Sequence, residues 1–352
     1  MKSLKVRHIP SLDGLRGIAA TLVVIHHAAL AYGQGALTRL IGAPTWNIVD
    51  HWGHNAVILF FCLSGFVLQW AMPQSARHYR LYGFRRVLRL YPALFVAITA
   101  SIAIRALSAQ SVDPATALRH YLVLGVSLDD ISYDYPIWSL VYEARFSIVF
   151  PLMAVACIRW PRAFLVGCTM LYAAATLASI ARGIGFPFMV GFGLANSVLL
   201  TLLYLPIFGF GMTLAHLYRK TGWTIPLRLE LPLTIAAILV FCLVRDQFLV
   251  ALAGLVVVYA AISAYAVVLQ STVVQFLARV SYSWYLTHMI VLSGVTMAFG
   301  KVLPMSMILL IFLAISLLAG WAVQKFVEGP ANDWARAFTQ TWRHKTVALA
   351  AG

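Results

Sequence analysis

The sequence predicts an all-α, polytopic integral membrane protein with about ten transmembrane helices. Two features of the composition indicate this class: 62% of the 352 residues are hydrophobic and only 11% are charged. Soluble domains are roughly 45–50% apolar and about 25% charged, so a soluble globular fold is excluded. A third observation is that the apolar residues form runs of about 20 residues, the length that crosses a bilayer as a helix.

Ten such runs follow one another along the chain. They cover residues 15–33, 55–71, 87–107, 137–158, 163–181, 189–217, 231–245, 248–269, 281–300 and 304–327. We expect residues 1–330 to form a single membrane-embedded domain and residues 331–352 to form a short basic cytoplasmic tail. An even number of spans places both termini on one side of the membrane.

The basic residues support this topology. The chain has 26 Lys and Arg against 11 Asp and Glu, a net charge of +15. With ten spans, 19 basic residues fall on the side of the termini, six fall on the other side, and Arg145 lies within a span. Cytoplasmic loops carry the excess of Lys and Arg, so both termini are predicted to be cytoplasmic in a cell inner (plasma) membrane. The positive charge therefore predicts contact with the bilayer and no nucleic-acid partner.

An alternative interpretation makes the first run a cleaved signal peptide. Residues 1–7 are basic, and Ala29-Leu30-Ala31 resembles a cleavage site. Against this alternative, His26 and His27 interrupt the apolar run, and its removal would disturb the sorting of basic residues.

The cysteines and loop histidines predict no metal site. All four cysteines lie inside apolar runs without a CxxC spacing, so buried structural thiols are expected at Cys62, Cys157, Cys168 and Cys242. A metal alternative would combine Asp50, His51 and His54 with His26 or His27, but no further acidic ligand is nearby.

Ionisable side chains within the spans are the first candidates for function, because placing them in a bilayer is costly. They are His26, His27, Glu143, Arg145 and His288. Arg16 and His27 are 11 residues apart, about 20° beyond three full helical turns, so they share one helix face. His26 is rotated about 80° from that face. His27 would lie roughly 16 Å from Arg16, beyond the bilayer middle.

Glu143 is expected at a depth similar to that of His27, in the outer half of the fourth span. A carboxylate beside an imidazole can orient it as a general base. The alternative is a structural pair between Glu143 and either Arg145 or His27, or an interhelical hydrogen bond for the histidine.

Arginines cluster at the cytoplasmic mouth of the third span. Arg86 and Arg89, together with Arg16, have the bidentate geometry that suits a phosphate clamp. The alternative is that these arginines bind lipid headgroups. In the second span, Ser64-Gly65 allows a helix or a ligand to approach closely, and helix packing alone would also explain it.

Several of these segments together resemble acyltransferase family 3, a family of integral-membrane acyltransferases. The resemblance rests on Ser11–Ala20 through His27, Phe60–Phe66, Arg86–Arg89 with Tyr91-Pro92, Trp138–Glu143 with Phe150-Pro151, Ser281–His288 and Glu328-Gly329-Pro330. Two positions depart from the family pattern: Ala144 follows Glu143 where many members have a second acidic residue, and Gly329 replaces a common Arg.

The resemblance implies transfer of an acyl group, most often acetyl, from cytoplasmic acyl-CoA (acetyl-CoA) to a hydroxyl of a carbohydrate or glycolipid acceptor. From the residues themselves, His27 is expected to be the catalytic general base, with Glu143 orienting its imidazole. Donor binding is expected at Arg16, Ser64, Arg86, Arg89 and His288. The loops 34–54 and 108–136, rich in Trp, Tyr, His and Asp, would face the acceptor on the outer side. A secondary transporter or flippase of a glycan or lipid is the alternative, disfavoured because no internal repeat is visible.

Overall fold

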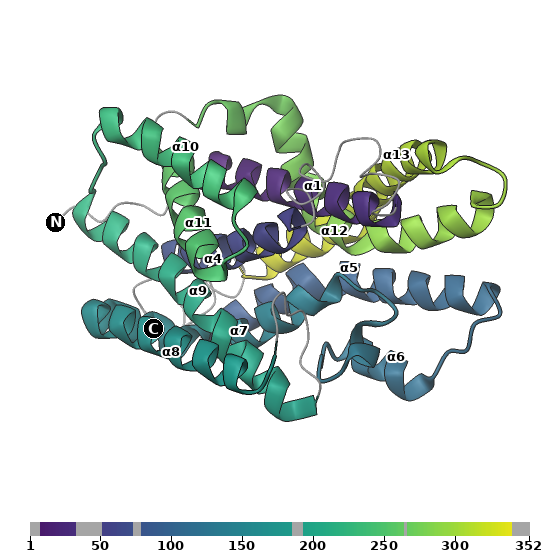
Figure 1. The fold of residues 1–352 in the computed structure, drawn as a ribbon, viewed down its shortest axis with the longest axis horizontal. Helices are drawn as coiled ribbons and strands as arrows, with labels where there is room; N and C mark the ends of the chain where they lie inside the picture. Colours follow the sequence, from purple (N-terminus) through teal and green to yellow (C-terminus); the bar gives the residue numbers. More distant parts are fainter. Residues whose placement is uncertain (1–7, 33–50, 73–78, 185–192, 264–265, 340–352) are drawn as a thin grey trace, which may run out of the picture.

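The computed structural model describes residues 8–32, 51–72, 79–184, 193–263 and 266–339, and the regular elements in these ranges are helices (Figure 1). The predicted all-α class is confirmed for the described chain. The elements are α1 (Pro10–Tyr32), α4 (Trp52–Ala71), α5 (Tyr79–Leu107), α6 (Pro114–Tyr121), η2 (Leu128–Ile131), α7 (Ile137–Arg159), α8 (Pro161–Ala181), α9 (Gly193–Thr221), α10 (Leu227–Leu243), α11 (Gln247–Ile262), η3 (Val268–Gln270), α12 (Thr272–Phe299), α13 (Met305–Val323) and the π-helical η4 (Gln324–Glu328).

Seven helices in the described part of the chain are long and apolar enough to cross a membrane. They are Pro10–Ala31, Trp52–Ala71, Tyr82–Leu107, Ile137–Arg159, Pro161–Ala181, Gly193–Thr221 and Met305–Thr339. Helices α10 and α11 have only 17 and 16 residues. Helix α12 has 28 residues but contains a polar stretch over Ser281–His288. Each of the ten predicted runs overlaps one α-helix, but the count of ten spans stays a prediction.

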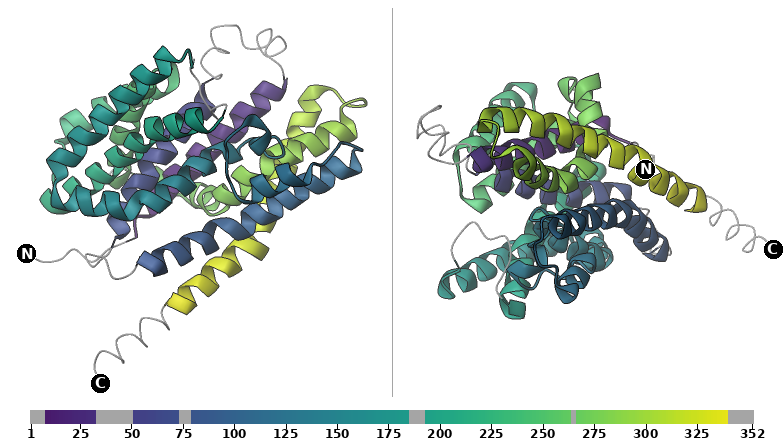
Figure 2. Two further views of the ribbon diagram at one scale, coloured as in Figure 1. Left: turned by 90° about the horizontal axis from the view of Figure 1, so that it is seen from below. Right: turned by 90° about the vertical axis from the view of Figure 1, so that its right-hand side faces the viewer.

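The predicted boundary at residue 330 does not coincide with a helix end. The last helix continues to Thr339, and its residues 331–339 run beside α5 (Figure 2). The ring of Phe84 on α5 packs against Trp334 and Phe338, with centroid distances of 5.8 and 4.8 Å. The helix passes Pro330, which lacks an N–H donor, because a π-helical turn precedes it. Residues 340–352 of the predicted tail lie outside the described residues.

The core forms where α4 crosses α9 at close range. A side chain at Gly65 would overlap the carbonyl of Phe208, and one at Gly211 would overlap the carbonyl of Cys62. Small residues at such a crossing let two backbones approach, which is how helices gain packing energy in a membrane. The predicted close approach at Ser64-Gly65 is therefore confirmed, with α9 as the partner.

The cysteines belong to this packed interior. All four are free thiols; Cys62, Cys157 and Cys168 are buried, and Cys242 is half-buried. The prediction of buried thiols is confirmed for the first three.

The connection between α5 and α7 is a folded cap over the end of the bundle (Figure 1). His120 on α6 is fully buried, its ring stacks on Tyr133 at a centroid distance of 4.5 Å, and its Nδ1–H donates to the carbonyl of Thr116 at 2.8 Å. Its Nε2 accepts the backbone N–H of Tyr133 at 2.9 Å. Arg119 adds an ion pair to the buried Asp130 at 2.7 Å.

This cap is expected to loosen at acidic pH. Burial lowers the pKa of His120, and a second ring proton would break its bond with the Tyr133 N–H. Below the ordinary histidine pKa of about 6.5, the unfolded cap therefore binds more protons than the folded cap. The folded cap is fully stable above that pH and loses stability as the pH falls below it. Amide hydrogen exchange is measured at pH 7 and pH 5, and each rate is divided by the intrinsic rate of an unstructured peptide at the same pH. For residues 120–135 this ratio should rise from pH 7 to pH 5, by at most about tenfold per pH unit. The non-titrating His120→Gln variant should lack this rise; an equal rise in both proteins would contradict the assignment.

Candidate functional site

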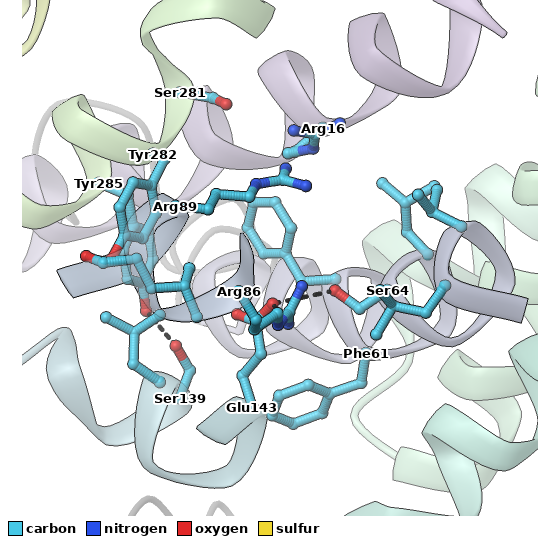
Figure 3. A pocket seen from close by; sticks show the side chains of 16 residues that line it. Arg16, Phe61, Ser64, Arg86, Arg89, Ser139, Glu143, Ser281, Tyr282 and Tyr285 are labelled. Carbon is cyan, nitrogen blue, oxygen red and sulfur yellow. Dashed lines mark hydrogen bonds and ion pairs between the residues drawn. The ribbon is translucent and has the colours of Figure 1, made fainter. Parts of the chain in front are cut away.

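An inner cavity of about 90 Å³ lies among α1, α4, α5, α7 and α12 (Figure 3). It brings together several of the side chains that the sequence analysis assigned to one site. Its polar lining consists of Arg16, Ser64, Arg86, Arg89, Ser139, Glu143, Ser281, Tyr282 and Tyr285. Five helices from different parts of the sequence thus contribute polar groups to one cavity.

Glu143 is bound to Arg86 at the centre of this cavity. The two side chains form an ion pair, with exposed fractions of 22% and 10%. The Ser64 hydroxyl also donates to Glu143, at 3.4 Å (Figure 3). Arg86 donates from Nε to the Ser147 hydroxyl at 2.9 Å, which fixes its orientation. In this structure Arg86 is therefore occupied by protein groups, whereas the sequence analysis assigned it to a phosphate.

Arg89 differs from its neighbours in having no hydrogen-bond or ion-pair partner among the described residues. Arg16, whose guanidinium lies close to that of Arg89 in Figure 3, pairs with Asp13. Arg89 feels the repulsion of Arg16 and Arg86 together with the attraction of Glu143 and Glu328. An unpaired guanidinium beside two others favours an anionic ligand.

A larger cavity of about 1060 Å³ adjoins the inner one, and both are lined by Arg16, Arg86 and Arg89. It adds the side chains of Arg279 and Arg336, which the sequence analysis did not single out. Arg279 lies two residues before Ser281, where the Ser281–His288 stretch begins, and this position was a signal in the sequence that could have indicated it. The two cavities together form a cationic mouth that leads into the bundle.

His27 lies against His288 and not against Glu143. The Nδ1 atom of His27 is 2.8 Å from Nε2 of His288, and the two rings stack at a centroid distance of 5.0 Å. Both residues are buried. Glu143 instead binds Arg86 and Ser64, so the predicted His27–Glu143 pair is not formed in this structure.

The hydrogen bonds of this pair define the ring protonation. Nδ1 of His288 lies 2.7 Å from the carbonyl oxygen of Tyr285, and a carbonyl only accepts. Nδ1 of a neutral His288 therefore carries the proton, and its Nε2 accepts from Nδ1–H of His27. This leaves Nε2 of His27 with a lone pair, which is the form of imidazole that can take up a proton.

Tyr285 connects the inner cavity to the histidine pair. Its ring lines the cavity, its hydroxyl lies 2.8 Å from that of Ser139, and its carbonyl accepts from His288. His26, in contrast, packs against Gly53 at the start of α4, where its ring leaves no room for a side chain. The two adjacent histidines thus have different main partners, Gly53 for His26 and His288 for His27, although their ring centroids lie 5.3 Å apart.

The other predicted site features are placed as follows. Arg145 donates to the carbonyls of Ser197 and Leu124, at 3.1 and 2.6 Å, and does not pair with Glu143. In the described part of the chain no group of three or more His, Cys, Asp or Glu could hold a metal ion. Asp50 and most of the 34–54 loop lie outside the described residues.

The fold and site define a helical membrane bundle with a cationic mouth and a buried histidine pair. A sequence family described as an acyltransferase domain matches residues 9–325. The chain therefore belongs to this acyltransferase family, as its motifs predict.

Two characterised relatives fit this assignment. The chain is 23% identical to the peptidoglycan O-acetyltransferase OatA of Listeria monocytogenes over 57% of its length and 30% of the relative. It is 30% identical to the acyltransferase MdmB of Streptomyces mycarofaciens over 42% of its length and 40% of that relative. The chain thus matches less than half the length of either relative. No solved structure matches it significantly.

Proposed function

We propose that this protein is a membrane O-acyltransferase that moves an acetyl group from acetyl-CoA to a hydroxyl of a carbohydrate or glycolipid. In this proposal the protein has ten spans in the plasma (inner) membrane, and both termini, with the arginine-lined mouth, are cytoplasmic. The acceptor lies on the outer side. The observation that carries the proposal is that the arginine-lined cavities reach Tyr285, whose carbonyl binds the His288 that holds His27.

The donor binds first at the mouth. Arg89 and Arg16 contact the phosphates of acyl-CoA, and Glu143 with Ser64 lines the path of the pantetheine arm. Arg16 and His27 are roughly 16 Å apart along α1, a distance that an extended arm must cover. The thioester then lies beside Tyr285, next to the histidine pair.

His27 performs the chemistry in this proposal. Its Nε2 takes the proton of the acceptor hydroxyl as that oxygen attacks the thioester carbonyl. The C–S bond then breaks, and His27 donates this proton to the CoA sulfur. The products are the ester of the acceptor and free CoA. His288 holds the His27 ring in the required tautomer, a positioning role in place of the donor contact expected from the sequence. The name of the Listeria relative supports a carbohydrate acceptor.

Sealed vesicles test both transfer and sidedness. Radiolabelled acetyl-CoA is supplied on the side of the C-terminal helix, with cell-surface glycan that mild alkali has stripped of esters on the other side. Impermeant maleimide labelling of Asp333→Cys and Asp129→Cys, two exposed positions, establishes the orientation. Label should enter the glycan, with release of CoA thiol.

Two results would contradict the proposal. Movement of a glycan or lipid without a covalent label would favour a transporter or flippase. Labelling only when donor and acceptor share one side would refute the transmembrane arrangement.

A further inference from the structure

Asp134 is a buried carboxyl group without a partner. Its exposed fraction is 1%, and neither carboxyl oxygen has a hydrogen-bond partner among the described residues. The mechanism above does not use it. A buried polar group left unpaired is costly, and such groups in native proteins call for an explanation.

The rest of the cap makes this exception clear. Asp130, equally buried, accepts from Arg119 at 2.7 Å and from the backbone N–H of Val126 at 2.7 Å. Asp113 accepts from the N–H of Thr116 at 2.7 Å. The cap thus gives Asp113 and Asp130 protein partners but leaves the buried Asp134 without one.

The residue that follows Asp134 contacts the histidine pair. The next residue, Tyr135, places its ring edge-on against His27 at a centroid distance of 6.3 Å. The Asp134 carboxyl is also close enough to Tyr285 to interact electrostatically, and the carbonyl of Tyr285 binds His288. The unpaired carboxyl is therefore linked to His27 through Tyr135 and to His288 through Tyr285.

We propose that Asp134 is an acceptor-binding residue whose carboxyl group hydrogen-bonds a hydroxyl of a polyhydroxylated acceptor, next to the hydroxyl that His27 deprotonates. The inference rests on the proposed function and adds the group that recognises its acceptor. Burial raises the pKa of Asp134 well above its usual range, so a neutral carboxyl can both donate and accept. A sugar hydroxyl has the same two capacities.

The leucine variant separates recognition from structure. Removing an unpaired buried polar group is neutral or stabilising, so Asp134→Leu should unfold at the same or a higher temperature than the parent protein. Its KM for the alkali-treated glycan should rise by about tenfold or more, with the KM for acetyl-CoA within about twofold. Asp129→Asn, an exposed position of the same cap, should match the parent in all three measurements.

Each other outcome overturns the inference. An unchanged glycan KM for Asp134→Leu would show that Asp134 does not contact the acceptor. A lowered unfolding temperature with both KM values raised would show that Asp134 has a structural role. Should the leucine variant not fold, Asp134→Ala is measured, and an unchanged glycan KM again refutes the proposal. A parent protein that does not acetylate the glycan refutes the proposed function itself, and this inference with it.

Discussion

Replacing His27 with alanine is expected to lower acetyl transfer by about 10²–10⁴-fold, the usual contribution of a general base. The reason is geometric: its Nδ1–H donates to His288, and its Nε2 keeps the lone pair. The measurement is the rate of CoA thiol release together with acetyl incorporation into the alkali-treated glycan.

His26→Ala is the matched control, because His26 is adjacent in sequence but packs against Gly53. This variant should retain most of the transfer rate. Equal losses in both variants would show that helical phase does not decide which histidine acts. Full activity of the His27→Ala variant would show that His27 is not the general base.

His288 provides a second control, since it acts through His27. His288→Ala should lower kcat and leave both KM values unchanged. His288→Gln should recover part of the rate, because its side-chain oxygen can accept the Nδ1–H of His27. A merely structural role for His288 would not give this rescue.

The helices were predictable from the sequence, because apolar runs of bilayer length depend only on local composition. The face shared by Arg16 and His27 follows from the same helical periodicity. The end of the last helix was not predictable in this way: Pro330 indicates a break, but the preceding π-helical turn lets the helix continue to Thr339.

The partners of the site residues were less predictable. Depth along a span placed Glu143 level with His27, but depth does not fix which helix each side chain faces. Because α5 packs against α7, Glu143 forms its ion pair with Arg86. Because α1 packs against α12, His27 forms its hydrogen bond with His288. Tyr285 and His288 are three residues apart and so share a helix face, a signal that could have linked them.

Arg89→Ala is expected to weaken use of acetyl-CoA by about 10- to 100-fold in kcat/KM, since a charge-assisted hydrogen bond contributes about 1.5–3 kcal/mol. Arg89 is the cation in question because it lines both cavities and has no partner among the described residues. S-acetylpantetheine, a donor without the phosphates of CoA, should be used equally well by the variant and the parent protein.

Arg86→Ala is expected to behave differently. Its loss leaves Glu143 without its ion-pair partner inside the cavity, so both donors should lose activity to a similar extent and the unfolding temperature should fall. The two donors therefore separate a phosphate contact from a structural ion pair. If Arg89→Ala impaired both donors equally, Arg89 would not be the phosphate contact. If Arg86→Ala impaired only acetyl-CoA, Arg86 would contact the phosphates, as the clamp of Arg16, Arg86 and Arg89 expected from the sequence implies.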